Sequence, residues 1–233
     1  LLNILMPHIE GNKSTMNWDI MTLDTVIDID QLQHWSDEVT ANYNKLWFNF
    51  SKKDYIKDKY KNKDFDFDGH GGGYHLKNLM EDNVQNIDYM ELSWPCEKDI
   101  PCPPVWAGKE DIYPELHDGS EYKIQKKFYY GYFKKLIDHL GEKYFARASL
   151  IRHQPKTVLT KHIDGPGIVR LHIPIYCNKG SKFLYGDNLE REHHLEVGKA
   201  YLINAGVPHG TVNGDEVRIH LQTKVKLEDI VNA

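Results

Sequence analysis

The carboxyl-terminal part of the chain, from about residue 145, is a series of short strand-like segments separated by turn signals. β-Branched and aromatic residues alternate with polar ones, which is the period of a strand with one buried face. Gly, Asn, Asp and Pro mark the turns, as at 164–167 and 213–215. The predicted strands are Arg147–His153, Lys156–Lys161, Val169–Tyr176, Lys182–Tyr185, Arg191–Glu196, Ala200–Asn204, Gly210–Asn213 and Val217–Val225. Eight short strands favour a sandwich or barrel, and the missing strand–helix alternation argues against Rossmann and TIM architectures.

The first 140 residues have a different pattern. All five Trp lie before residue 110. Apolar residues spaced by three and four predict helices within Asp30–Phe50 and Glu121–Leu140, the second ending at Gly141. Tyr89–Trp94 is a predicted strand, and the prolines of Pro95–Pro114 predict an extended connection. This region is therefore expected to be mixed and partly helical.

The composition is that of a globular protein. The 233 residues are 40% hydrophobic and 12% aromatic, with a net charge of −5. A weakly acidic chain has no general attraction for nucleic acids or anionic membranes, and no apolar run approaches the ~18 residues of a membrane helix. Three cysteines, Cys96, Cys102 and Cys177, are too few for a disulfide framework. With no recognisable signal peptide, we expect a cytoplasmic protein without nucleic-acid or membrane partners.

Three residues of the strand region have the chemistry of a metal site. His162 and Asp164 are two residues apart at the end of a predicted strand, so their side chains point to the same face. His209 comes from a later strand and can supply a second imidazole. Two His and one carboxylate leave three adjacent positions open in an octahedral Fe(II) shell.

Two further pairs of polar residues lie on the strands. Arg170 and His172 share one face of their strand, and Arg218 and His220 share one face of the last strand. Charged residues directed into a small barrel are costly unless they meet an anion or a metal. The planar guanidinium fork fits a carboxylate, so an anionic ligand is expected near these arginines.

The ordered set H-x-D, R-x-H-x-P, H and R on this strand pattern resembles the Fe(II)- and 2-oxoglutarate-dependent oxygenases. More narrowly, it resembles the aspartyl/asparaginyl β-hydroxylase family and the related free-proline hydroxylases. The resemblance covers about Ala146–Val225. It implies a mainly β fold, a double-stranded β-helix (a jelly-roll, cupin-like barrel). We expect an N-terminal region over 1–140, the barrel over 141–226 and a tail over 227–233.

The resemblance also implies a role for each polar residue of the set. The implied iron ligands are His162, Asp164 and His209. Arg218 corresponds to the arginine that binds the far carboxylate of 2-oxoglutarate. Arg170 and His172 correspond to the pair that approaches its near carboxylate.

The function implied is that of an Fe(II)- and 2-oxoglutarate-dependent dioxygenase. It would hydroxylate an unactivated C–H bond of an amino acid or peptidyl side chain (Asp-, Asn- or Pro-like), with CO₂ and succinate as co-products. Its partners would be dioxygen and a small-molecule or peptide substrate. Two alternatives remain open: a non-catalytic jelly-roll binding domain, and a metal cupin enzyme that does not use 2-oxoglutarate. The glycine-rich segment Gly69–Gly73 is either a lid over the barrel mouth or an ordinary surface loop.

Overall fold

A computed structural model of the chain describes residues 18–49, 86–94, 123–145, 147–165 and 167–225. The predicted connection Pro95–Pro114 and the loop Gly69–Gly73 lie outside these residues. The first part contains β1 (Ile20–Leu23), α1 (Ile29–Asn42), a 3₁₀ turn (Asn44–Leu46), β2 (Phe48–Asn49), β3 (Ile87–Glu91), β4 (Ser93–Trp94), β5 (Lys123–Ile124), α4 (Gly131–Leu140) and a second 3₁₀ turn (Glu142–Phe145). The second part contains β6 (Arg147–His153), β7 (Val158–His162), β8 (Val169–Tyr176), β9 (Lys182–Tyr185), β10 (Arg191–His193), β11 (Ala200–Asn204), β12 (His209–Val212) and β13 (Arg218–Val225).

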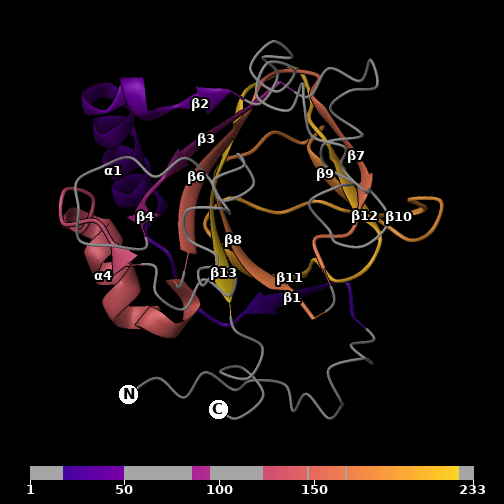
Figure 1. The fold of residues 1–233 in the computed structure, drawn as a ribbon, viewed down its shortest axis with the longest axis horizontal. Coiled ribbons are helices and arrows are strands. Elements are labelled where there is room, and N and C mark those ends of the chain that lie inside the picture. Colours follow the sequence, from indigo (N-terminus) through magenta and orange to yellow (C-terminus); the bar gives the residue numbers. More distant parts are fainter. Residues whose placement is uncertain (1–17, 50–85, 95–122, 146, 166, 226–233) are drawn as a thin grey trace, which may run out of the picture.

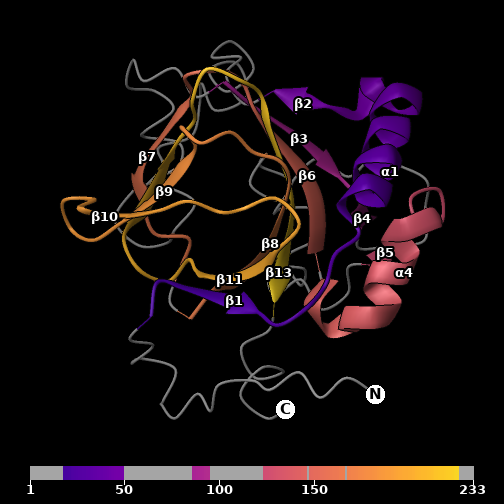
Figure 2. The same ribbon diagram turned by 180° about the vertical axis from the view of Figure 1, so that it is seen from behind.

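The strands form two main sheets that face each other (Figures 1 and 2). The major sheet has the order β1-β11-β8-β13-β6-β3-β2, and the minor sheet has the order β10-β9-β12-β7. All pairings in both sheets are antiparallel. Strands β6 to β13 therefore divide into four on each sheet, which is the arrangement of an eight-stranded jelly roll. The predicted fold class, mainly β with a jelly-roll core, is confirmed.

The outer face of the major sheet is covered by α1 and α4, which lie side by side against it in both ribbon views. Asp28 caps α1 by accepting a hydrogen bond from the backbone amide of Gln31 at 3.2 Å. The rings of Trp35 and Phe133 stack between the two helices, with their centroids 4.3 Å apart. The main apolar core lies here, between the helices and the outward-facing strand residues.

The inner face of the major sheet is polar, because side chains alternate between the two faces of a strand. Leu171 and Leu221 are buried in the core beneath the helices. Their chain neighbours Arg170, His172 and His220 line the space between the sheets instead. The alternation predicted for these strands is thus observed. A smaller apolar cluster lies among the strands on that side: Phe183, Tyr185, Leu195, Tyr201 and Ile203.

The first part of the chain contributes to the same sheet. Strand β1 pairs with β11, and β3 pairs with β6, so both extend the major sheet beyond the four jelly-roll strands. None of the described helices is both long enough and apolar enough to cross a membrane.

Both predicted helices are shorter in the structure than their patterns indicated. The helix predicted to run to Phe50 ends at Asn42, since the chain then enters a 3₁₀ turn and pairs as β2. The helix predicted from Glu121 begins at Gly131, because Lys123–Ile124 forms strand β5, which pairs with β4. Strands β6, β8, β9 and β11 have the predicted bounds.

Candidate metal centre and its cavity

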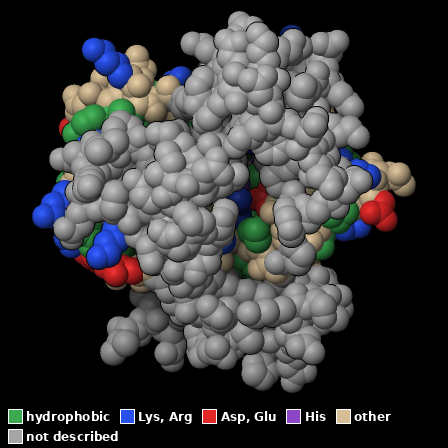
Figure 3. All heavy atoms as spheres, viewed as in Figure 1, with side chains coloured by type: hydrophobic (Ala, Val, Ile, Leu, Met, Phe, Trp, Pro, Cys, Tyr) green, Lys and Arg blue, Asp and Glu red, His purple; other side chains and the backbone are tan. Residues whose placement is uncertain are grey.

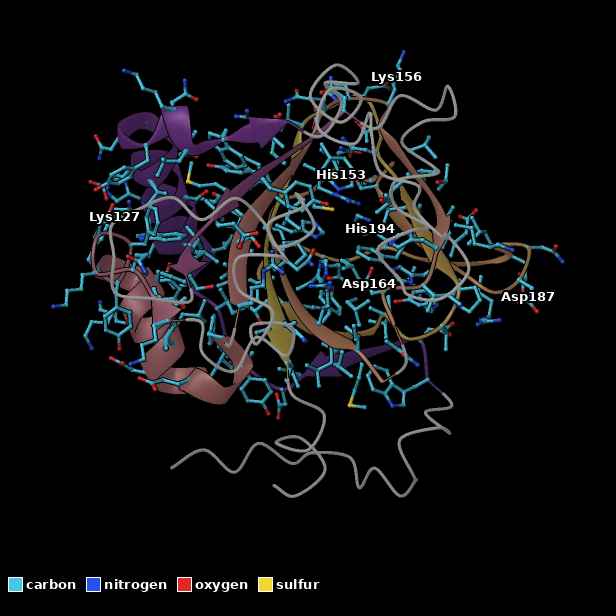
Figure 4. The ribbon with its side chains drawn as sticks, in the orientation of Figure 1. Lys127, His153, Lys156, Asp164, Asp187 and His194 are labelled. Carbon is cyan, nitrogen blue, oxygen red and sulfur yellow. The ribbon has the colours of Figure 1, made fainter. Side chains whose placement is uncertain are left out.

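The two sheets enclose a cavity of about 220 Å³. Its walls come from β6, β8, β11 and β13 of the major sheet, from β3 beside them, and from β7, β9 and β12 of the minor sheet. Figure 4 shows Asp164 and His153 in the space between the sheets, whereas Lys127 and Asp187 lie at the periphery. Charged side chains of both signs are visible in the opening at the centre of the face shown in Figure 3.

The structure brings His162, Asp164 and His209 together at one wall of this cavity. His162 ends β7 and His209 begins β12, and the two are directly paired across the antiparallel strands. Their ring centroids are 4.2 Å apart. Asp164 follows β7 in a loop held by its backbone amide, which donates to the carbonyl of Ala205 at 2.9 Å. One ligand atom from each of the three residues lies within 4.8 Å of the others, so the group can hold a metal ion.

Backbone carbonyls set the orientation of both imidazoles. Nδ1 of His162 lies 2.8 Å from the carbonyl of Thr160, and Nδ1 of His209 lies 2.9 Å from that of Val207. A carbonyl only accepts hydrogen bonds, so both Nδ1 atoms carry a proton, which leaves Nε2 as the atom of each ring that can bind a metal. Burial, with the neighbouring His162, lowers the pKa of His209 to about 4. The ring is therefore neutral at neutral pH, which is the state that binds a metal.

The third residue, Asp164, is held between an imidazole and a guanidinium. Its Oδ1 lies 3.5 Å from Nε2 of His162, and its Oδ2 accepts a hydrogen bond from Nε of Arg170 at 2.5 Å. The side-chain oxygen of Gln222, in the orientation that satisfies both of its polar atoms, accepts from Nη1 of Arg170 at 3.1 Å. Arg170 is thus held in place against the carboxylate of Asp164.

The other end of the cavity holds a buried cation. The side chain of Arg218 is 3% exposed, and its Nη2 lies 2.9 Å from the ring nitrogens of His153 and 3.5 Å from Oγ1 of Thr211. Its guanidinium lies 5.6 Å from the centre of the Phe183 ring. Burial lowers the pKa of Arg218 to about 10, so it stays charged at neutral pH. Within the described part of the chain, no Asp or Glu forms an ion pair with it.

Three buried histidines surround Arg218. Burial first, and the positive charge of Arg218 next, hold the pKa values of His153 and His220 well below their usual range. Burial, followed by Arg170 and Arg218, does the same for His172. All three rings are neutral at neutral pH, so none adds a second positive charge beside the guanidinium.

One atom of this cluster has no partner. Nδ1 of His172 and Nδ1 of His220 are 3.4 Å apart, so one donates and the other accepts. Nε2 of His220 is buried and makes no hydrogen bond to the described part of the chain. Among the described residues, this wall of the cavity thus has one buried polar atom without a hydrogen bond and one buried cation without a carboxylate, which favours the binding of a polar ligand.

All six residues predicted to bind a metal or co-substrate line this one cavity. Sequence reasoning missed other polar residues that also line it, among them Glu91, His153 and Thr211. His153 was inside a correctly predicted strand, and alternation with Ile151 places it on the inner face. Glu91 was not found because the pairing of β3 with β6 depends on the tertiary fold.

No protein-family model matches the chain, and no curated protein matches it either. The resemblance to the aspartyl/asparaginyl β-hydroxylase family therefore remains a resemblance.

The chain is similar to several solved structures. A 2OG-Fe(II) oxygenase family oxidoreductase from Burkholderia pseudomallei shares 15% identity at a TM-score of 0.35, over 60% of this chain and 68% of that one. A Pseudomonas putida prolyl-4-hydroxylase shares 9% identity at a TM-score of 0.41, over 88% and 91%. A Trichoplax adhaerens prolyl hydroxylase in complex with a hypoxia inducible factor peptide shares 11% at 0.39, over 95% and 98%. At these scores the strand order of the two sheets remains the basis for assigning the fold.

Proposed function

We propose that the chain is an Fe(II)- and 2-oxoglutarate-dependent dioxygenase that hydroxylates an unactivated C–H bond. One observation carries the proposal: a His-Asp-His group shares one cavity with a buried arginine that pairs with no carboxylate of the described residues. The first provides a site for Fe(II), and the second provides a site for an anionic co-substrate.

The three residues of the group fit Fe(II). Two imidazoles that present Nε2 and one carboxylate would supply three ligands, which suits a ferrous ion with open positions. Bound there, Fe(II) would supply the open coordination at which a 2-oxo acid and dioxygen react. Arg170 would keep Asp164 in its orientation, and the two backbone carbonyls would keep the imidazoles in theirs.

Arg218 would bind the far carboxylate of 2-oxoglutarate. A bidentate contact would pair a guanidinium that forms no ion pair with the described residues, and low-dielectric surroundings would strengthen that attraction. His153 accepts from Nη2 and so fixes the direction of the guanidinium. Phe183 and Ile203 contribute apolar surface to the cavity, which helps to exclude water. Arg170 and His172 would approach the near carboxylate of 2-oxoglutarate.

The substrate would be an amino acid side chain, either free or in a peptide, with CO₂ and succinate as co-products. The motif resemblance supports this choice, and the similar structures named above include prolyl hydroxylases. We also propose that the chain divides at residues 140 and 226 and that the protein is cytoplasmic.

Succinate formation tests the proposal. Incubation with Fe(II), 2-oxoglutarate and dioxygen should give slow succinate release without added substrate, and Arg218→Met should abolish it. Binding of iron without any 2-oxoglutarate binding would instead favour a metal cupin enzyme that does not use the oxo acid. Failure to bind either would favour a non-catalytic jelly-roll domain.

A further inference from the structure

Three polar side chains form a row across the inner face of the major sheet, apart from the metal-binding group and from Arg218. Glu91 on β3 is the cross-strand partner of Ser149 on β6, and Ser149 is the cross-strand partner of Gln222 on β13. All three line the cavity. Neighbouring strands are about 4.8 Å apart, so the row spans roughly 10 Å of the wall.

Glu91 is the unusual member of this row. Its side chain is 10% exposed, and Oε1 accepts a hydrogen bond from Nη2 of Arg147 at 3.1 Å. Its other oxygen, Oε2, is buried and has no hydrogen-bond partner among the residues that the structure describes. Leaving such an oxygen unpaired is costly, so a fold that keeps it gains from a donor that arrives with a ligand.

Gln222 closes the other end of the row. Its amide oxygen is turned to Arg170, so its amide nitrogen faces another direction and offers N–H donors. Arg170 in turn holds Asp164. The row therefore has an acceptor at Glu91, the hydroxyl of Ser149 in the middle, and a donor at Gln222 beside the metal-binding group.

We infer that Glu91, Ser149 and Gln222 form the subsite that recognises an N–H group of the substrate, with Glu91 Oε2 as its acceptor. The nitrogen is either the ammonium group of a free amino acid or an amide N–H of a peptide. An anionic group is disfavoured here, because it would meet the Glu91 carboxylate. That the bound molecule is a substrate rests on the proposed function. The kind of group recognised is inferred from the contacts of Glu91.

The test is binding rather than turnover. The protein as purified is titrated, without dioxygen, with the proteinogenic L-amino acids and their N-acetyl derivatives, and the shift in Tm is recorded. Each probe that binds is compared by calorimetry with the analogue that has oxygen in place of the nitrogen. Glu91→Gln keeps an acceptor for Arg147 but replaces the free acceptor by a donor. Glu192→Gln, the same change at an exposed residue of β10, is the matched control.

We expect the wild type and Glu192→Gln to prefer the nitrogen compound over its oxygen analogue. Glu91→Gln should lose at least about tenfold of that preference, as for a hydrogen bond to a charged group. Binding of free amino acids alone would identify an ammonium group, and binding of N-acetyl derivatives alone would identify an amide. Both results support the subsite.

Two results would overturn the inference. One is that Glu91→Gln and Glu192→Gln bind every probe like the wild type, as expected if only water occupies the row. The other is that no probe shifts the Tm of the wild type. Titration of 2-oxoglutarate into the same preparations separates this inference from the proposed function. Glu91→Gln should bind the oxo acid within about twofold of the wild type, since Arg218 is unchanged.

Discussion

Arg170 Nε donates a hydrogen bond to Asp164 Oδ2 across 2.5 Å, while the other oxygen of that carboxylate faces His162. The contact joins a residue of β8 to the loop after β7, so it ties the major sheet to the loop that carries Asp164. A metal ligand whose second oxygen is held by a guanidinium keeps its orientation before the ion arrives.

Arg170→Met should therefore weaken metal binding without removing a ligand. Loss of such a supporting contact lowers metal affinity by about 10- to 100-fold. Competition of the variant with a chromophoric chelator for Fe(II) or Zn²⁺ measures the change. Arg191→Met, which breaks the Asp19 pair at the surface, should leave the affinity at the wild-type value. Equal affinity in Arg170→Met and the wild type would show that Arg170 does not support the ligand.

Asp164→Ala removes the proposed ligand itself. Fe(II) affinity should fall by at least an order of magnitude, because one of three protein donors is lost. The same chelator competition measures it. Unchanged affinity and unchanged succinate formation would mean that the two imidazoles hold the metal without the carboxylate.

Arg218→Met should weaken the binding of 2-oxoglutarate without lowering the stability of the fold. Removing a buried cation that has no carboxylate partner relieves a desolvation cost, so the free energy of unfolding should stay level or rise by about 1–3 kcal/mol. Binding of 2-oxoglutarate should fall at least about tenfold. Chemical denaturation and calorimetry measure the two quantities.

The matched control for that change is Arg152→Met. Arg152 donates to the buried carboxylate of Asp88 at 2.8 Å and lies over the Trp47 ring. Its loss should destabilise the protein by about 1–3 kcal/mol, because it removes the cationic partner of a buried carboxylate. A comparable destabilisation in Arg218→Met would contradict a ligand-binding role for that residue.

The pairing of Asp19 with Arg191 predicts a pH-dependent attachment of β1. Two hydrogen bonds from Arg191, at 2.7 and 2.9 Å, lower the pKa of Asp19. A carboxyl whose pKa is lower in the folded state stabilises the fold above its unfolded pKa of about 3.9, and that contribution is lost as the pH falls through the folded pKa. Because the pair is at the surface, the contribution should be at most about 1 kcal/mol.

Asp19→Asn measures that contribution. The variant should be less stable than the wild type at neutral pH, and the difference should vanish once the pH lies below the folded pKa. Urea denaturation at a series of pH values gives both quantities. A difference that persists unchanged in acid would show that the ion pair is not its source.

The strand pattern predicted most of the jelly roll, because alternation is a local property of the sequence. Strands β6, β8, β9 and β11 show it over their whole length, and their bounds agree with the structure. Short strands such as β1 and β5 were not predicted, since each is defined by a partner distant in the sequence.

The candidate site was predicted to a similar extent. The residues in the ordered motif share one cavity, as the alternation and spacing indicated. The contact of Arg170 with Asp164 and the free oxygen of Glu91 were not predicted. Both depend on which strands become neighbours, and that is set by the packing of the whole sheet.

The most direct test of the central claim is an anaerobic visible spectrum of the wild type with Fe(II) and 2-oxoglutarate. We predict a charge-transfer band on addition of the oxo acid, which reports its chelation of a ferrous ion with open positions. The band should be lost in Asp164→Ala and should require much more 2-oxoglutarate in Arg218→Met. Bound Fe(II) with no band at saturating 2-oxoglutarate would contradict the claim.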